Sequence, residues 1–293
     1  MTRWKAWWLA IRPKTLPAVV GPVLTGWGLA WHDGVFRWGP ALAALAGGVL
    51  LQIGANLAND VADFRRGADT EARLGPVRVT QAGLLSPAAV TAGMWVAFGL
   101  AAAVGVYLVC AAGWPVIAIG LTAILAAIGY TGGPWPYGYY GLGDIFVFLY
   151  FGLAAVVGTY FVQARAVSAA AWWAAVPLGL LAVAILVVNN LRDIPTDRQA
   201  GKRTLAVLLG ESGARREYDV CVFGAYGVTL LAALLGVFPW TAAMVLLSLP
   251  HAWRTRRIVH TQQGRALNAA LARTGQLVLF FGALLAIGFA LAS

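Results

Sequence analysis

Nine long apolar runs constrain this chain more than any other feature of its sequence. They lie at about 16–31, 38–60, 87–111, 114–130, 141–163, 168–191, 217–236, 239–253 and 270–292. A helix needs about 20 mostly apolar residues to cross a bilayer, and most runs approach that length. Only 11% of the 293 residues are charged, against roughly a quarter in soluble domains, which excludes a soluble globular enzyme. We expect an all-α polytopic membrane protein with nine transmembrane helices, or eight, since the fourth and eighth runs are short.

The chain is expected to form one integral-membrane domain over residues 1–293. No linker, low-complexity segment or fixed repeat divides it, although the segments 52–78 and 185–203 share a weak theme of Asn and Asp followed by a basic loop. Gly113 and Pro115 predict a tight turn between the third and fourth runs. Near the N-terminus, Arg12 and Lys14 interrupt the apolar stretch, which argues against a cleavable signal peptide.

Charged residues are confined almost entirely to one side of the predicted membrane. All but two of the 21 Lys and Arg residues fall on the N-terminal side, the exceptions being Arg37 and Arg165. The positive-inside rule therefore places the N-terminus in the cytoplasm. We expect the membrane to be the plasma membrane of a prokaryote. Of the 11 acidic residues, only Asp33 lies elsewhere, which indicates a polar site open to the cytoplasm. The sequence has no basic block interleaved with aromatic residues, so we expect no nucleic-acid partner.

The second run ends in the polar sequence QIGANLANDVADF. Its fourfold spacings pair Asn59 with Asp63 and Asn56 with Asp60, which predicts two polar stripes along a helix and several oxygen ligands in one direction. A helix end at the membrane interface would explain one or two of these residues. Carboxylates within a membrane segment are costly and usually functional, so four favour a site.

The sixth run ends in a similar sequence, AILVVNNLRDIPTDRQAGKR. Asn189, Asp193 and Asp197 are spaced by four, but Pro195 predicts that the helix ends or kinks near Asp193 and that Asp197 points elsewhere. Two oxygen-rich helix ends on one membrane side suit Mg²⁺, which takes one or two carboxylates together with substrate phosphate oxygens. The missing partner would be a diphosphate.

Basic residues near these motifs are suited to hold such a diphosphate, since guanidinium groups bind phosphate in a bidentate manner. Membrane-anchoring charges are the alternative for each of them. The candidates are Lys14, Arg73, Arg78, Arg192, Lys202 and Arg203.

The loop YTGGPWPYGYYGLGD precedes the fifth run and contains no basic residue. Its Gly and Pro content favours irregular backbone, which is tolerated at membrane depth only where it is buried or lines a cavity. Tyr130, Tyr137 and Tyr139 are candidates for stacking an aromatic ligand, with Asp144 as a proton acceptor or a hydrogen-bonding group. An interfacial aromatic belt is the alternative explanation for the tyrosines.

Taken together, these three blocks in matching order over residues 12–211 resemble the UbiA-type membrane prenyltransferases, and within them the branch that prenylates 1,4-dihydroxy-2-naphthoate. The resemblance implies helices around a central cavity that opens laterally to membrane lipid, Mg²⁺, an isoprenyl diphosphate, and transfer of the prenyl group to the naphthoate with loss of diphosphate and CO₂. Gly67 stands where the broader superfamily has an acid and fits the naphthoate branch, which disfavours other acceptor branches.

By motif position, the resemblance implies two metal sites and a set of catalytic groups. The first metal site would use Asn59 and Asp63, with Asp60 and Asp69 accessory; the second would use Asn189, Asp193 and Asp197. Asp63, Asp193, Asp144, Tyr130 and Tyr137 are the catalytic candidates. A cation-coupled carrier is the rival hypothesis, which the one-sided charge distribution disfavours because carriers need access from both faces.

Overall fold

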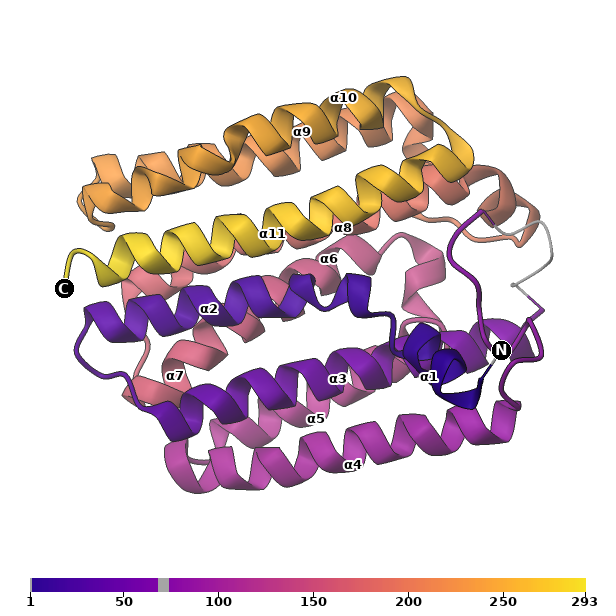
Figure 1. Ribbon diagram of the computed structural model, residues 1–293, viewed down its shortest axis with the longest axis horizontal. Helices are drawn as coiled ribbons and strands as arrows, with labels where there is room; N and C mark the ends of the chain where they lie inside the picture. Colours follow the sequence, from indigo (N-terminus) through magenta and orange to yellow (C-terminus); the bar gives the residue numbers. More distant parts are fainter. Residues whose placement is uncertain (1, 68–73) are drawn as a thin grey trace.

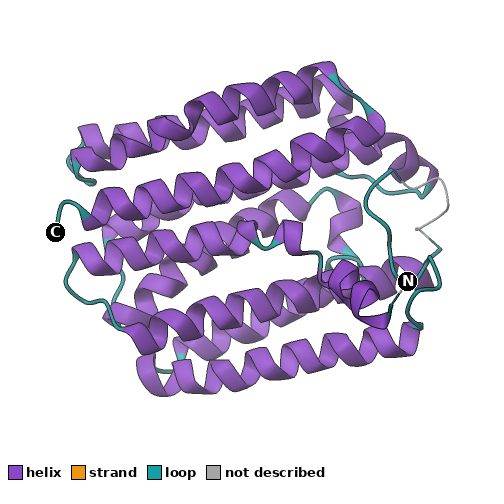
Figure 2. Cartoon of the chain, in the orientation of Figure 1, coloured by secondary structure: helices purple, strands orange, loops and turns teal. Residues whose placement is uncertain are grey.

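The structure is a computed structural model that describes residues 2–67 and 74–293, and every regular element in these ranges is helical (Figure 2). The long helices lie roughly side by side, with α1 at the end of the bundle opposite the C-terminus (Figure 1). The elements are α1 (Arg3–Ile11), η1 (Pro13–Thr15), α2 (Pro17–His32), α3 (Trp38–Arg65), α4 (Pro87–Ala112), α5 (Pro115–Gly129), η2 (Tyr137–Tyr140), α6 (Gly143–Val147), η3 (Phe148–Val157), α7 (Gly158–Ala164), α8 (Ala169–Gln199), α9 (Leu205–Leu234), η4 (Trp240–Ser248), α10 (Leu249–Thr261), η5 (Gly264–Ala266) and α11 (Leu267–Ala290).

Six helical segments in the described residues are long and apolar enough to cross a membrane. They are α3, α4, the continuous segment Gly143–Ala164, α8, α9 and Gly264–Ala290. The other three predicted runs form α2, α5 and the η4–α10 segment, of which α2 has 16 residues and α5 has 15. An integral membrane protein is thus supported, while nine spans and a cytoplasmic N-terminus stay predictions.

Helix α8 is the most buried of the six segments and packs against α9, α11, α2 and η3. Small residues permit this close packing, as is common between membrane helices. A Cβ atom added at Gly152 of η3 would lie 2.7 Å from the Cα atom of Gly179 in α8. On α11, a Cβ at Gly282 would collide with the backbone of Gly21 in α2. The helices around α8 therefore depend on glycine at their crossing points.

Helices α3 and α8 both extend beyond the apolar runs that predicted them. α3 continues to Arg65, so the whole first motif is helical. α8 continues to Gln199, and the prediction that it ends near Asp193 is wrong. Pro195 removes one hydrogen bond, but Ile194 and Asp197 on either side of it are buried, and this packing holds the last turn. The turn predicted at Gly113 and Pro115 is confirmed between α4 and α5.

Candidate active site

The two Asn- and Asp-rich motifs line one pocket at the end of the bundle where α3 and α8 terminate. The pocket has a volume of about 80 Å³, enough for a few water molecules. Its lining comprises Asn59, Asp63, Arg78, Tyr130, Thr131, Gly138, Tyr139, Asn189, Asn190, Asp193, Thr196, Asp197, Lys202 and Thr204. Asp197, expected to point elsewhere, therefore faces the same pocket as Asp63 and Asp193.

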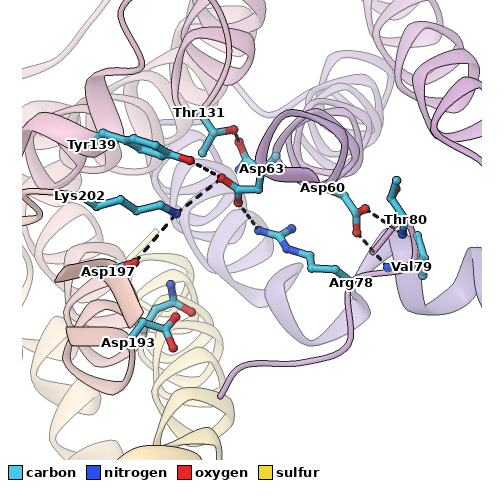
Figure 3. Close-up of polar contacts among 12 residues, drawn as sticks. Asp60, Asp63, Arg78, Val79, Thr80, Thr131, Tyr139, Asp193, Asp197 and Lys202 are labelled. Atoms are coloured by element: carbon cyan, nitrogen blue, oxygen red, sulfur yellow. Dashed lines mark hydrogen bonds and ion pairs between the residues drawn. The ribbon is translucent and has the colours of Figure 1, made fainter. Parts of the chain in front are cut away.

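Asp63 is the central acceptor of the pocket, and its carboxylate is 3% exposed. Its Oδ2 atom accepts a hydrogen bond from Arg78 Nη2 at 3.0 Å, and its Oδ1 atom accepts one from the Tyr139 hydroxyl at 2.8 Å (Figure 3). Two separate segments thus donate to one buried carboxylate. The buried charge is compensated by hydrogen-bonded partners, as burial of an ionised group requires.

Lys202 connects the two motifs across the pocket. Its Nζ atom lies 3.5 Å from Asp63 Oδ1 and 3.9 Å from Asp197 Oδ1, as Figure 3 shows. The same ammonium lies 4.4 Å from the centre of the Tyr139 ring, within the range of a cation–π interaction. The backbone N–H of Lys202 donates to the carbonyl of Asp197 at 2.9 Å, which fixes the lysine just beyond the end of α8.

Arg192 lies behind the second motif and does not line the pocket. It is 1% exposed, and its Nε atom donates to Asp193 Oδ1 at 2.8 Å. Its Nη2 atom donates to Asn189 Oδ1 and its Nη1 atom to Asn268 Oδ1, both at 2.8 Å. Asn268 in turn donates to the carbonyl of Leu74 at 3.0 Å. Arg192 therefore orients Asn189 and Asp193 and links α8 to α11.

Asp60 and Asn56 face away from the pocket, although they belong to the first motif. The carboxylate of Asp60 accepts from the backbone N–H groups of Val79 and Thr80, each at 3.1 Å (Figure 3). Asn56 donates to the carbonyl of Ile11 at 2.9 Å, at the end of α1. Both residues thus hold neighbouring backbone, and Asp60 positions the segment that delivers Arg78 to Asp63.

Among the candidate tyrosines, Tyr130 and Tyr139 line the pocket and Tyr137 does not. The Tyr137 ring stacks on Phe146 with centroids 3.9 Å apart, and its hydroxyl donates to the carbonyl of Ala126 at 2.8 Å. Burial raises the pKa of Tyr137, and burial with the nearby charge of Asp144 raises the pKa of Tyr130. Both phenols are therefore neutral near pH 7.

Asp144 is the second residue of α6 and is 9% exposed. Its Oδ1 atom is buried and has no hydrogen-bond partner among residues 2–67 and 74–293. It is not part of the pocket lining, but its charge acts on Tyr130, which is. Asp144 thus lies behind the tyrosine wall of the pocket.

Of the remaining candidates for binding diphosphate, the structure describes two and does not describe the third. Lys14 and Arg203 are exposed and are not in the pocket lining. The backbone N–H of Arg203 donates to the carbonyl of Tyr139 at 2.8 Å, so the main chain of this residue supports the tyrosine loop. Asp69 and Arg73 lie outside the described residues.

Sequence reasoning missed three contributors to the site. Tyr139 was considered only for stacking, yet it donates to Asp63. Thr131 donates to Asn59 Oδ1 at 2.9 Å, and Asn268 anchors Arg192. The available signal for Asn268 was a polar side chain close to the start of the last apolar run, since polar groups in such segments usually have a partner there.

The donor set of the pocket suits a hard cation that is shared with a substrate. Its lining offers amide and carboxylate oxygens and no thiol or imidazole ligand. In the described part of the chain, no three His, Cys, Asp or Glu side chains are grouped closely enough to hold a metal ion by themselves. That combination fits Mg²⁺, which uses few protein carboxylates and completes its coordination with phosphate oxygens and water.

Comparison with known proteins identifies relatives over the full length of the chain. A 1,4-dihydroxy-2-naphthoate octaprenyltransferase from Mycobacterium tuberculosis is 40% identical over 293 residues, covering 100% of this chain and 98% of the relative. The protein of the same name from Escherichia coli is 37% identical, covering 98% and 96%. A 2-carboxy-1,4-naphthoquinone phytyltransferase from Synechocystis is 27% identical, covering 88% and 83%.

Solved structures share the fold at much lower sequence identity. A UbiA homologue from Aeropyrum pernix superposes with a TM-score of 0.72 at 16% identity, covering 92% of this chain and 97% of that one. A UbiA homologue from Archaeoglobus fulgidus, solved bound to DMAPP and Mg²⁺, has a TM-score of 0.68 at 13% identity, covering 96% and 99%. The sequence model of the UbiA prenyltransferase family matches residues 19–273, and the chain belongs to this family.

Proposed function

We propose that this chain transfers a polyprenyl group from an isoprenyl diphosphate to 1,4-dihydroxy-2-naphthoate, with Mg²⁺ and with release of diphosphate and CO₂. The observation that carries the proposal is the convergence of both Asp-rich motifs, Arg78 and Lys202 on one pocket. The full-length relatives named as octaprenyltransferases for this acceptor, at 40% and 37% identity, support the choice of substrate.

The side chains that would hold the metal are Asn59, Asp63, Asn189, Asp193 and Asp197, because these candidate ligands of the two motifs all line the pocket, as does Asn190. Bound Mg²⁺ would neutralise charge that develops on the departing diphosphate. Arg78 and Lys202 now pair with Asp63. If Asp63 held the metal, Arg78 and Lys202 would be close enough to contact phosphate oxygens and would stabilise the negative charge of the leaving group.

Tyr139 and Tyr130 form the aromatic side of the same pocket. Tyr139 holds Asp63 through its hydroxyl, and Tyr130 presents a neutral phenol to the space in which the acceptor would bind. Asp144, behind Tyr130, is our candidate for the phenolic proton of the acceptor, since one of its oxygens lacks a partner in the described residues. We place the pocket toward the cytoplasm on the charge distribution of the sequence.

The proposal is tested with the purified full-length chain, Mg²⁺ and geranylgeranyl diphosphate. Dihydroxynaphthoate, 4-hydroxybenzoate and homogentisate are supplied separately, and lipid products and CO₂ are measured by mass spectrometry. Prenylated naphthoquinol with equimolar CO₂ is expected. A product from another ring would contradict the proposed acceptor. Ion-driven uptake into vesicles, with no product from any acceptor, would instead establish the carrier hypothesis.

A further inference from the structure

A second cavity lies away from the active-site pocket, between α10 and α11, which are neighbours in Figure 1. Its volume is about 510 Å³, within the range of about 300–1,000 Å³ that is typical of ligand pockets. The apolar part of its wall is formed by Leu247, Phe280 and Leu284, and the polar part includes His251 and Arg254. None of these residues lines the active-site pocket.

Polarity changes in one direction along this groove. Arg254 lies near the middle of α10 and is, of the groove residues on η4 and α10, the one nearest the helix end that leads to α11, where the basic residues of this region gather. Leu247 precedes it by about two helical turns. On α11, Phe280 and Leu284 follow Arg273, whose carbonyl oxygen lies 2.8 Å from His251 Nε2. The cationic end therefore lies near the membrane interface and the apolar end lies deeper, as in an ordered lipid molecule.

The guanidinium of Arg254 is available for a ligand. Arg256, two residues later, is bound to both carboxylate oxygens of Asp219 at 2.9 Å. Arg254 is exposed and makes no hydrogen bond or ion pair with any residue in the ranges 2–67 and 74–293. His251 is held by the Arg273 carbonyl and by an edge-on contact with Phe280, with centroids 5.6 Å apart. An arginine that is unpaired beside an apolar cavity is complementary to an anionic head with an attached hydrocarbon chain.

We infer that this groove, defined by Leu247, His251, Arg254, Phe280, Ala283 and Leu284, binds an anionic glycerophospholipid, with its phosphate at Arg254 and an acyl chain along Phe280 and Leu284. A phosphodiester carries one negative charge, which matches the single arginine of the groove. An isoprenyl diphosphate carries more charge and needs several cations or a metal, which the active-site pocket supplies and this groove does not. The inference is independent of the reaction proposed above.

The test is lipid binding to the full-length protein in detergent, measured by native mass spectrometry. Phosphatidylglycerol and phosphatidylcholine with the same acyl chains are titrated separately. We expect the first bound molecule of phosphatidylglycerol to have about fivefold higher affinity than the first bound molecule of phosphatidylcholine. One basic residue near an anionic lipid raises the affinity by roughly that factor. Arg254→Gln should abolish this preference. The matched control is Arg257→Gln, which removes an exposed arginine of the same helix outside the groove and should leave the preference unchanged.

Three outcomes would overturn the inference. The first is equal affinity of the wild-type protein for the two lipids. The second is an equal loss of preference in both arginine variants, which would mean general attraction to a basic face. The third is displacement of phosphatidylglycerol by geranyl diphosphate without divalent cation, which would assign the groove to the isoprenyl substrate. Ala283→Phe, which fills the groove, should weaken both lipids, and the unfolding midpoint confirms that each variant is folded.

Discussion

Replacing Arg192 with lysine tests whether this residue acts by orienting its neighbours or by its charge alone. The substitution keeps the positive charge and removes the planar fork of hydrogen-bond donors. Arg192 donates four hydrogen bonds, to Asp193 twice, to Asn189 and to Asn268. A compact ammonium cannot span these acceptors, so we expect about two of the bonds to be lost. At about 1.5 kcal/mol for a hydrogen bond to a charged group, the free energy of unfolding falls by about 3 kcal/mol. This corresponds to a fall of roughly 6–12 °C in the unfolding midpoint.

The assay has two parts, thermal unfolding of the ligand-free protein and prenyl transfer as a function of Mg²⁺ concentration. Because Arg192 orients two candidate metal ligands, the Mg²⁺ concentration for half-maximal activity should rise about 10- to 100-fold. Arg198→Lys is the control, since Arg198 is an exposed residue on the same helix. An unchanged midpoint together with a raised KM for the diphosphate alone would refute the argument. That result would place Arg192 in direct contact with the substrate.

Four further predictions concern the active site and the tyrosine loop beside it. Asp63→Asn keeps the shape of the side chain and removes the charge that faces Arg78 and Lys202, so kcat should fall about 10²- to 10³-fold in the product assay. Tyr139→Phe, which removes a bond to that carboxylate, should lower kcat about tenfold or more. Tyr137→Phe should instead cost about 1 kcal/mol of stability in thermal unfolding and leave turnover per folded molecule near wild type. Chelation with EDTA should abolish transfer, and added Mg²⁺ should restore it, because Mg²⁺ is held through few protein carboxylates and shares its remaining coordination with substrate phosphate and water.

Apolar run length was sufficient to predict most of the helices, but not their ends. The second apolar run ends at about residue 60, whereas α3 continues to Arg65. Polar residues terminate an apolar run without terminating a helix when tertiary contacts bury them, as they do for Asp60 and Asp63. The same reasoning explains Pro195, whose local effect on the backbone is outweighed by the packing of its neighbours. At the ends of α3 and α8, which carry the site, tertiary packing therefore outweighs the local helix propensity of the residues.

Arg192 and Tyr139 show why residue type and spacing did not assign roles within the site. An arginine beside Asp193 fits a phosphate contact as well as a support for that carboxylate. Which of these two roles Arg192 has depends on its contact with Asn268. Asn268 is distant in sequence and contacts Arg192 only after α11 packs on α8. Similarly, Tyr139 reaches Asp63 through a loop whose path no periodic pattern encodes. Such roles follow from tertiary contacts and are not contained in a local motif.

The first motif shows how one helix serves structure and chemistry with the same residue types. Successive helical residues point about 100° apart, so neighbours such as Asn59 and Asp60 are able to serve different surfaces. Asn59 and Asp63 face the pocket, whereas Asp60 holds the backbone of Val79 and Thr80. Arg78 immediately precedes these two residues and reaches Asp63. Asp60 therefore fixes the segment that carries Arg78, and Arg78 is the cation that pairs with Asp63. The acidic residues of this motif therefore have two functions, since Asp60 positions backbone and Asp63 is a candidate metal ligand. Loss of either residue should impair the same pocket, Asp60 through the position of Arg78 and Asp63 directly.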